Sequence, residues 1–177
     1  MPLLTLIGYR GCGKSTIAAL LAERRGCSWL DADTVLETAV GSSIAELIES
    51  EGEAAFRDAE ATILESELAM FAGVVATGGG VVLRPANRRL LRAAFRPVVW
   101  LAAPAAVVRQ RLADDPTTAT RRPALSGGDP LDEVAAAVVD REPLYRECAD
   151  HVVDTSSSVP EAVADAVAAW LGEEWQP

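Results

Sequence analysis

The stretch GYRGCGKS at residues 8–15 decides how this chain is expected to fold. A short apolar run precedes it at residues 3–7, and a segment with the apolar spacing of a helix follows at 15–25. The pattern GxxxxGKS between a buried strand and a helix is typical of a loop that wraps phosphate groups. Its glycines allow successive backbone N–H groups to point inward, and the positive end of the helix dipole adds to their effect. The stretch therefore predicts a nucleotide-phosphate site directly after the first strand.

The side chains of this loop have separate expected tasks. Lys14 is the only lysine beside fifteen arginines. Its compact ammonium suits the β and γ phosphates of a nucleotide, where a broad guanidinium would not fit. The Ser15 hydroxyl is positioned to ligate Mg²⁺. The other loop residues that we expect to contact the nucleotide are Gly11, Cys12, Gly13 and Thr16, and we interpret Cys12 as a small space-filling side chain.

Periodicity along the rest of the chain favours an α/β fold. Short β-branched or apolar runs alternate with longer segments of helical spacing, and no repeat or low-complexity segment interrupts them. Strands that are covered by helices on both faces form a parallel sheet, so we expect three layers, α/β/α, in one domain over residues 1–177. The expected strands are 3–7, 27–31, 73–77, 97–101 and 151–154, and the expected helices are 15–25, 44–50, 52–71, 85–94, 104–113, 130–148 and 160–171.

Composition limits the classes of partner. Half of the 177 residues are apolar, which is enough for one buried core, and the formal net charge of −10 argues against nucleic acid or an anionic membrane as partner. Three widely spaced cysteines suggest neither a disulfide framework nor a zinc site, which fits a reducing cytosol. No apolar run approaches the roughly 20 residues that span a bilayer. We expect a cytoplasmic protein whose partners are small molecules.

One segment, DDPTTATRRPALSGGD at residues 114–129, fits neither a helix nor a strand. It combines prolines, glycines, threonines and paired arginines, and it is long for a plain connection. We therefore expect a mobile lid here.

A phosphate loop alone does not separate a switch, a motor and a small-molecule kinase. The NKxD-type motif of regulatory GTPases is absent. Five further motifs remain to be explained, and parallel sheets bind ligands at the edge where their strands end, which is where several of these motifs fall. They are Asp31-Ala32-Asp33, Phe56-Arg57-Asp58-Ala59-Glu60, Gly78-Gly79-Gly80, Arg122-Pro123-Ala124-Leu125 and Arg141-Glu142-Pro143-Leu144-Tyr145.

In this order and spacing, the motifs resemble those of the shikimate kinase family over residues 3–171. The resemblance implies a P-loop kinase fold with strand order 2-3-1-4-5. It also implies transfer of the ATP γ-phosphoryl group to the 3-hydroxyl of shikimate, in chorismate and aromatic amino-acid biosynthesis, by a protein that we expect to be a monomer. Two alternatives stay open. One is another small-molecule kinase such as gluconate kinase, and the other is a non-catalytic nucleotide-binding regulatory protein.

The resemblance also assigns roles to single residues. It implies that Asp33 holds the attacked hydroxyl and accepts its proton, so that Lys14, Asp33 and Arg122 form the catalytic set. It places Asp31 near Mg²⁺, through water. For both aspartates, the residues alone fit a polar strand end or a helix cap equally well. We expect residues 34–60 to form a helical region that binds the substrate.

Two arginines are implied to grip the shikimate carboxylate, for which a planar guanidinium is suited. They are Arg57 and Arg141, and an ordinary surface ion pair is the alternative for both, since Arg141 has acidic neighbours at 140 and 142. Backbone groups of Gly78, Gly79 and Gly80 are implied to contact the substrate ring.

The remaining implied roles concern the nucleotide. Arg122 in the lid reaches the transferring phosphoryl group when the lid closes. Arg111 stacks beneath adenine, and residues 155–160 cover it, although Ser156-Ser157-Ser158 lacks the basic residue of several family members. We expect His151, on a strand, to be structural.

Overall fold

Five parallel strands form the centre of the molecule. The computed structural model describes residues 1–114, 132–156 and 158–175. The strands are β1 (Leu4–Ile7), β2 (Trp29–Asp31), β3 (Val74–Ala76), β4 (Val98–Ala102) and β5 (His151–Asp154). They pair in the order β2-β3-β1-β4-β5 and all neighbours run parallel. The expected α/β fold and strand order are confirmed.

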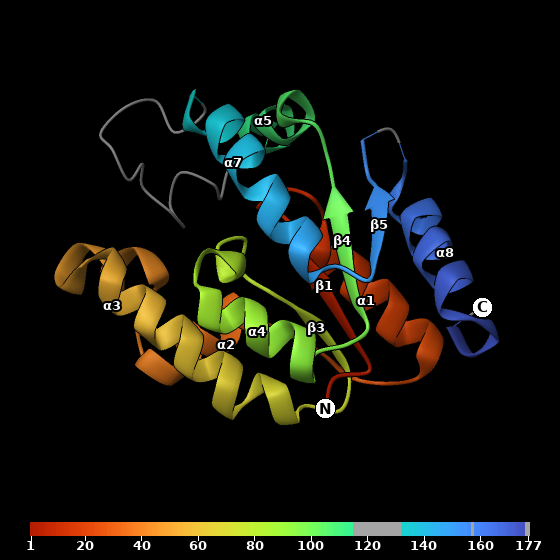
Figure 1. The fold of residues 1–177 in the computed structure, drawn as a ribbon, viewed down its shortest axis with the longest axis horizontal. Coiled ribbons are helices and arrows are strands. Elements are labelled where there is room, and N and C mark those ends of the chain that lie inside the picture. Colours follow the sequence, from red (N-terminus) through yellow and green to blue (C-terminus); the bar gives the residue numbers. More distant parts are fainter. Residues whose placement is uncertain (115–131, 157, 176–177) are drawn as a thin grey trace.

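Alternation along the strands sends side chains to the two faces of the sheet. Helices lie on both sides of the sheet (Figure 1). Leu4 and Leu6 pack with α1 (Lys14–Arg25) and α8 (Pro160–Leu171), whereas Ile7 packs with the helices on the opposite face. These opposite helices are α2 (Ala32–Val40), α3 (Ile44–Ser66), α4 (Pro85–Ala94) and α7 (Asp132–Cys148). The core is thus two apolar layers, one on each face of the sheet.

One further helix and three short turns complete the described part of the fold. Helix α5 (Ala105–Asp114) packs against α7 through Val108, Leu112 and Val134. Three 3₁₀ turns complete the described elements, η1 (Leu68–Met70), η2 (Val81–Leu83) and η3 (Glu173–Trp175).

The strand register brings the candidate site together at one edge. Ala76 of β3 pairs with Leu6 of β1 on one side and with Asp31 of β2 on the other. The residues that follow these strands therefore leave the sheet side by side. They are the phosphate loop after β1, the start of α2 after β2 and the three glycines after β3.

The two edge strands differ from the expectation that all strands are buried on both faces. Trp29 at the start of β2 is exposed, and along β5 only Val153 is buried. An outer strand has a neighbour on one side only, so less of it is covered. His151 of β5 stacks on Trp170 of α8 with ring centroids 4.7 Å apart, which is consistent with a structural role.

The helical region after β2 is built from three pieces. Helix α2 was not expected as a separate helix, and α3 is interrupted at Gly52, whose φ of 89° and ψ of 165° are not helical. The first arm of α3 begins with a capping box between Ser43 and Glu46, and the second arm carries Arg57 and Glu60. The break matches the expected boundary between helices at 44–50 and 52–71, although the second arm ends at Ser66.

Within the described ranges, no helix has both the length and the apolar character needed to cross a membrane.

The break in α3 leads to a stability prediction. The backbone angles of Gly52 fall in a region that is accessible essentially to glycine alone, while no atom lies within 4 Å of an added Cβ. Gly52→Ala should therefore lower the free energy of unfolding by about 1–3 kcal/mol through backbone strain. Urea denaturation measures this loss.

Gly41 supplies the matched control, because it also has open space but lies in the left-handed region that asparagine tolerates. Gly41→Asn should lower the free energy of unfolding by less than Gly52→Asn does. Equal stability of the Gly52→Ala variant and the parent would contradict the break as the structure has it.

Candidate functional site

The phosphate loop has the local geometry that its sequence predicts. Gly8, Gly11 and Gly13 all have positive φ angles, and α1 begins at Lys14. The side chain of Lys14 lies inside the loop, where its Nζ donates to the carbonyl oxygens of Gly8 and Tyr9, each at 3.0 Å. Only 8% of the residue is exposed. The single lysine is thus folded into the centre of the loop that we expect to hold the phosphates.

Ser15 and Asp31 lie next to each other although 16 positions separate them. The Ser15 hydroxyl donates to Asp31 Oδ2, while Asp31 Oδ1 accepts the backbone N–H of Asp33 at 2.9 Å and caps α2. Asp31 is therefore a helix cap, as the plainer interpretation holds. The other oxygen of the same carboxylate accepts the hydrogen bond from Ser15.

These two side chains fit the ligand preferences of Mg²⁺. A hydroxyl and a carboxylate oxygen are hard oxygen donors, and Mg²⁺ bound with nucleotide phosphates needs few protein ligands. No group of three or more His, Cys, Asp or Glu side chains suited to a metal occurs in the part of the chain that the structure describes. The donor set fits an ion that is held mainly by phosphates and water.

A cleft of about 240 Å³ lies beside the phosphate loop. Arg111 of α5 reaches across it, where Nη1 donates to Thr155 Oγ1 at 3.1 Å and to the Gly11 carbonyl at 3.4 Å. The structure thus brings Arg111 and the segment after β5 together at the loop, as expected for a nucleotide-base site. The cleft is lined by Gly11, Cys12, Gly13, Thr16, Ile17, Arg111, Thr155, Ser158, Pro160 and Val163.

Two of the three glycines after β3, Gly78 and Gly80, pack directly against charged side chains. A Cβ on Gly78 would lie 2.7 Å from Asp33 Oδ1 and 2.8 Å from Glu60 Oε1. A Cβ on Gly80 would lie 2.1 Å from Arg57 Nη1. Any larger residue would displace these groups, so the bare backbone is what allows Asp33, Arg57 and Glu60 to converge on this turn.

Arg57 is held by two carboxylates of its own helix. Its Nη1 donates to Glu60 Oε2 at 2.9 Å, and Nε and Nη2 both donate to Glu53 Oε1, at 3.3 and 3.2 Å. Arg57 is only 9% exposed and Glu60 only 6%. The ion-pair alternative is correct in that the pairs exist, but only Glu53 is substantially exposed, and the buried pair with Glu60 helps to fix the orientation of a buried guanidinium.

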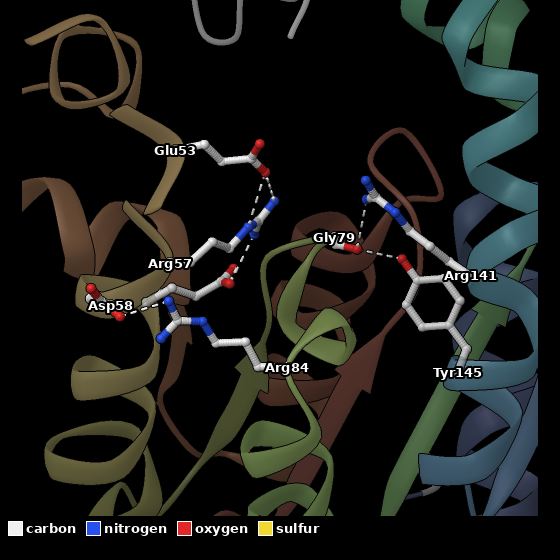
Figure 2. Close-up of polar contacts among 8 residues, drawn as sticks. Glu53, Arg57, Asp58, Gly79, Arg84, Arg141 and Tyr145 are labelled. Carbon is white, nitrogen blue, oxygen red and sulfur yellow. Dashed lines mark hydrogen bonds and ion pairs between the residues drawn. The ribbon is translucent and has the colours of Figure 1, made fainter. Parts of the chain in front are cut away.

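Arg141 approaches the same turn from the opposite side. Figure 2 shows Arg57 and Arg141 on either side of Gly79, whose carbonyl accepts Arg141 Nη1 at 3.3 Å. The Arg141 guanidinium also lies 5.1 Å from the centre of the Tyr9 ring. Its neighbour Glu142 pairs with Arg146 at 2.9 Å, so that pair does not involve Arg141.

The structure adds contacts that sequence reasoning did not assign. The Tyr145 hydroxyl donates to the Gly79 carbonyl, Glu53 binds Arg57, and Tyr9 lies beneath Arg141. The spacing of Arg141 and Tyr145, one helical turn apart, was a usable signal for the first contact. The expected lid at 114–129 and Arg122 fall outside the described residues, apart from Asp114 at the end of α5.

Taken as chemistry, one edge of the sheet combines three functions. The loop around Lys14 supplies N–H groups and a cation for phosphates, Asp33 supplies a proton acceptor, and Arg57 and Arg141 supply two forks for an anionic group. Such an arrangement suits transfer of a phosphoryl group to a hydroxyl of a small anionic molecule.

Comparison with known proteins agrees with this chemistry. The family model described as shikimate kinase matches residues 10–172. A shikimate kinase from Rhodopirellula baltica is 48% identical over 153 residues, which cover 86% of this chain and 81% of the relative. One from Oleidesulfovibrio alaskensis is 45% identical over 154 residues, with coverage of 87% and 88%.

A solved structure has the same fold. Shikimate kinase from Acinetobacter baumannii in complex with shikimate matches with a TM-score of 0.84 and 33% identity, covering 93% of this chain and 89% of that one. Because the family model spans nearly the whole chain and relatives are 45–48% identical over most of its length, the protein belongs to the shikimate kinase family.

Proposed function

We propose that this protein transfers the γ-phosphoryl group of ATP to the 3-hydroxyl of shikimate, giving shikimate 3-phosphate and ADP. The observation that carries the proposal is the convergence of Arg57, Arg141 and Asp33 on the glycine turn that follows β3, next to the phosphate loop. Shikimate has one carboxylate and three hydroxyls on a small ring, and this site offers two guanidiniums and one carboxylate to meet them.

The two arginines would bind the substrate carboxylate. Charge-assisted hydrogen bonds from a planar fork are among the strongest that a protein offers, and Arg57 is already oriented by Glu53 and Glu60. Binding the carboxylate would fix the ring over the backbone of Gly78, Gly79 and Gly80 and place its hydroxyls toward Asp33. Positioning of this kind lowers the entropic part of the barrier to reaction.

Asp33 would act on the attacking hydroxyl. Its backbone N–H is held by Asp31 at 2.9 Å and its carboxylate lies against Gly78, so it has a fixed place beside the proposed substrate ring. A carboxylate within hydrogen-bond reach of a hydroxyl orients the oxygen and accepts its proton as the bond to phosphorus forms.

The phosphate loop would hold the nucleotide. Lys14 and the loop N–H groups stabilise the charge on the transferring phosphoryl group, and the cleft at Arg111 takes the base and ribose. When bound, Mg²⁺ neutralises part of the phosphate charge, and Ser15 and Asp31 are the residues that would hold it, Asp31 through water. Arg122, from the expected lid at 114–129, is proposed to reach the phosphoryl group on closure.

The remaining parts of the proposal rest on the sequence. We propose a single domain over residues 1–177, a substrate-binding helical region at 34–60, and a cytoplasmic monomer that serves chorismate and aromatic amino-acid biosynthesis without nucleic-acid or membrane partners. No observation in the described geometry favours a gluconate kinase or a non-catalytic regulator instead.

The role of Asp33 gives a kinetic prediction. Asp33→Asn keeps the shape but removes the proton acceptor, so kcat should fall by about 10²-fold or more, with a much smaller change in the KM for ATP. Steady-state kinetics with shikimate and ATP measure both quantities. A small change in kcat together with a large rise in the KM for shikimate would show that Asp33 only binds the substrate.

The carboxylate clamp gives a second prediction. Replacing Arg57 or Arg141 with Ala should weaken shikimate binding by about ten- to a hundredfold while ATP binding hardly changes, because each removes a charge-assisted contact. Lysine at either position should restore only part of the affinity, since it keeps the charge without the fork. Calorimetric titration of each ligand separates the two effects.

A neutral analogue, in which the shikimate carboxylate is an uncharged amide, is the control. It should bind the parent protein poorly and lose little more when either arginine is removed, because the arginines and the carboxylate share one interaction. The clamp is wrong if the amide binds as well as shikimate, or if the arginine variants lose ATP affinity instead.

A further inference from the structure

Tyr145 is a buried residue of the site whose hydroxyl points at the glycine turn. It lies on α7 one helical turn after Arg141, and only 2% of it is exposed. Its ring stacks on Trp100 of β4 with centroids 5.7 Å apart and an interplanar angle of 21°. The packing of the ring against the sheet therefore fixes the direction in which the hydroxyl points.

That hydroxyl and Arg141 share one acceptor. Tyr145 Oη donates to the Gly79 carbonyl at 2.5 Å, and Arg141 Nη1 donates to the same oxygen at 3.3 Å, as Figure 2 shows. A carbonyl oxygen has two lone pairs, so the pair of donors fills its capacity. Burial raises the pKa of Tyr145, which keeps the phenol protonated and a donor at neutral pH.

Gly79 is confined on its other side by the phosphate loop. An added Cβ would lie 3.0 Å from the backbone nitrogen of Arg10 and 3.5 Å from the Gly8 carbonyl. The peptide of Gly79 is therefore enclosed between the phosphate loop and α7. Its carbonyl lies in the interior, where an unsatisfied acceptor is costly, so this oxygen needs a donor whether or not Arg141 is engaged elsewhere.

The two side chains that donate to the Gly79 carbonyl differ in how freely they can turn to another partner. Tyr145 is held in place by its ring and has a single O–H donor, whereas Arg141 carries five N–H donors on a flexible chain. If the Tyr145 hydroxyl were missing, Arg141 alone would have to satisfy the Gly79 carbonyl. That demand would compete with the carboxylate of the substrate for the same guanidinium.

We propose that Tyr145 is a positioning residue, whose hydroxyl satisfies the Gly79 carbonyl and thereby leaves the guanidinium of Arg141 available to the substrate carboxylate. This inference rests on the proposed function, since it assigns Tyr145 a task in binding shikimate. Tyr145 acts through Arg141 and Gly79 and does not itself touch the reacting atoms.

The test is Tyr145→Phe, which removes one oxygen and keeps the ring on Trp100. The KM for shikimate should rise by about three- to tenfold, the worth of one hydrogen bond, while kcat and the KM for ATP change by less than about twofold. The amide analogue of shikimate should bind the variant and the parent equally weakly. A role confined to stability would lower the melting temperature and leave the KM for shikimate unchanged.

Thr5→Val is the matched control. The Thr5 hydroxyl also donates to a buried carbonyl, that of Phe95 at 2.8 Å, but it lies on β1 below the phosphate loop. This variant should lose stability without a change in the KM for shikimate.

A double variant tests whether Tyr145 acts through Arg141. In the Arg141→Ala background, Tyr145→Phe should add little to the KM for shikimate, because the group that it positions is gone. Additive effects, an unchanged KM in the single variant, or an equal rise in the KM for ATP would each overturn the inference. Absence of shikimate turnover in the parent would instead overturn the proposed function, so the two failures are distinguishable.

Discussion

The absence of side chains at residues 78–80 is the constraint on which the candidate site depends. Asp33 and Glu60 occupy the space that a Cβ on Gly78 would take, and Arg57 occupies the space beside Gly80. These side chains come from α2 and α3, while Arg141 reaches the carbonyl of Gly79 from α7. Three helices can place charged groups around one turn only because the turn itself offers nothing but backbone.

The site holds cations although the protein as a whole carries a negative net charge. The formal net charge is −10, yet the expected reactants, ATP and a carboxylate, are both anions. The structure meets them with a few buried or partly buried cations whose positions are fixed by neighbours. Lys14 is held by two loop carbonyls, and Arg57 by Glu53 and Glu60. Low solvent exposure strengthens such contacts, so a few cations suffice where a basic surface would otherwise be needed.

Features encoded by local spacing were the ones that the sequence could predict. The phosphate loop, the five strands and most helices follow from turn residues and from periods of 2 and 3.6, which need no knowledge of distant neighbours. The exposed faces of β2 and β5 were missed because a strand's place at the edge of a sheet is a property of topology.

Contacts between helices were harder to predict. Residues 53 and 57 are four apart, so a pair was conceivable, but the burial of the Arg57 guanidinium against Gly80 depends on how α3 turns after Gly52. The bond from Tyr145 to Gly79 spans 66 positions, and the spacing of Arg141 and Tyr145 indicates only that both side chains lie on one face of the helix, not which group they contact. For the carboxylates at 31 and 33, the residues alone did not decide between a helix cap and a ligand-binding role. The structure shows that Asp31 caps α2 and also binds the Ser15 hydroxyl.

The most direct test of the account is the choice of phosphoryl acceptor. ADP release from ATP should be measured with shikimate, with gluconate and with no acceptor, on the same preparation. The account predicts rapid release with shikimate and only background release in the other two reactions, because the proposed site combines two arginines for the substrate carboxylate with a proton acceptor for the attacking hydroxyl. Equal release with gluconate, or release that does not depend on any acceptor, would contradict it.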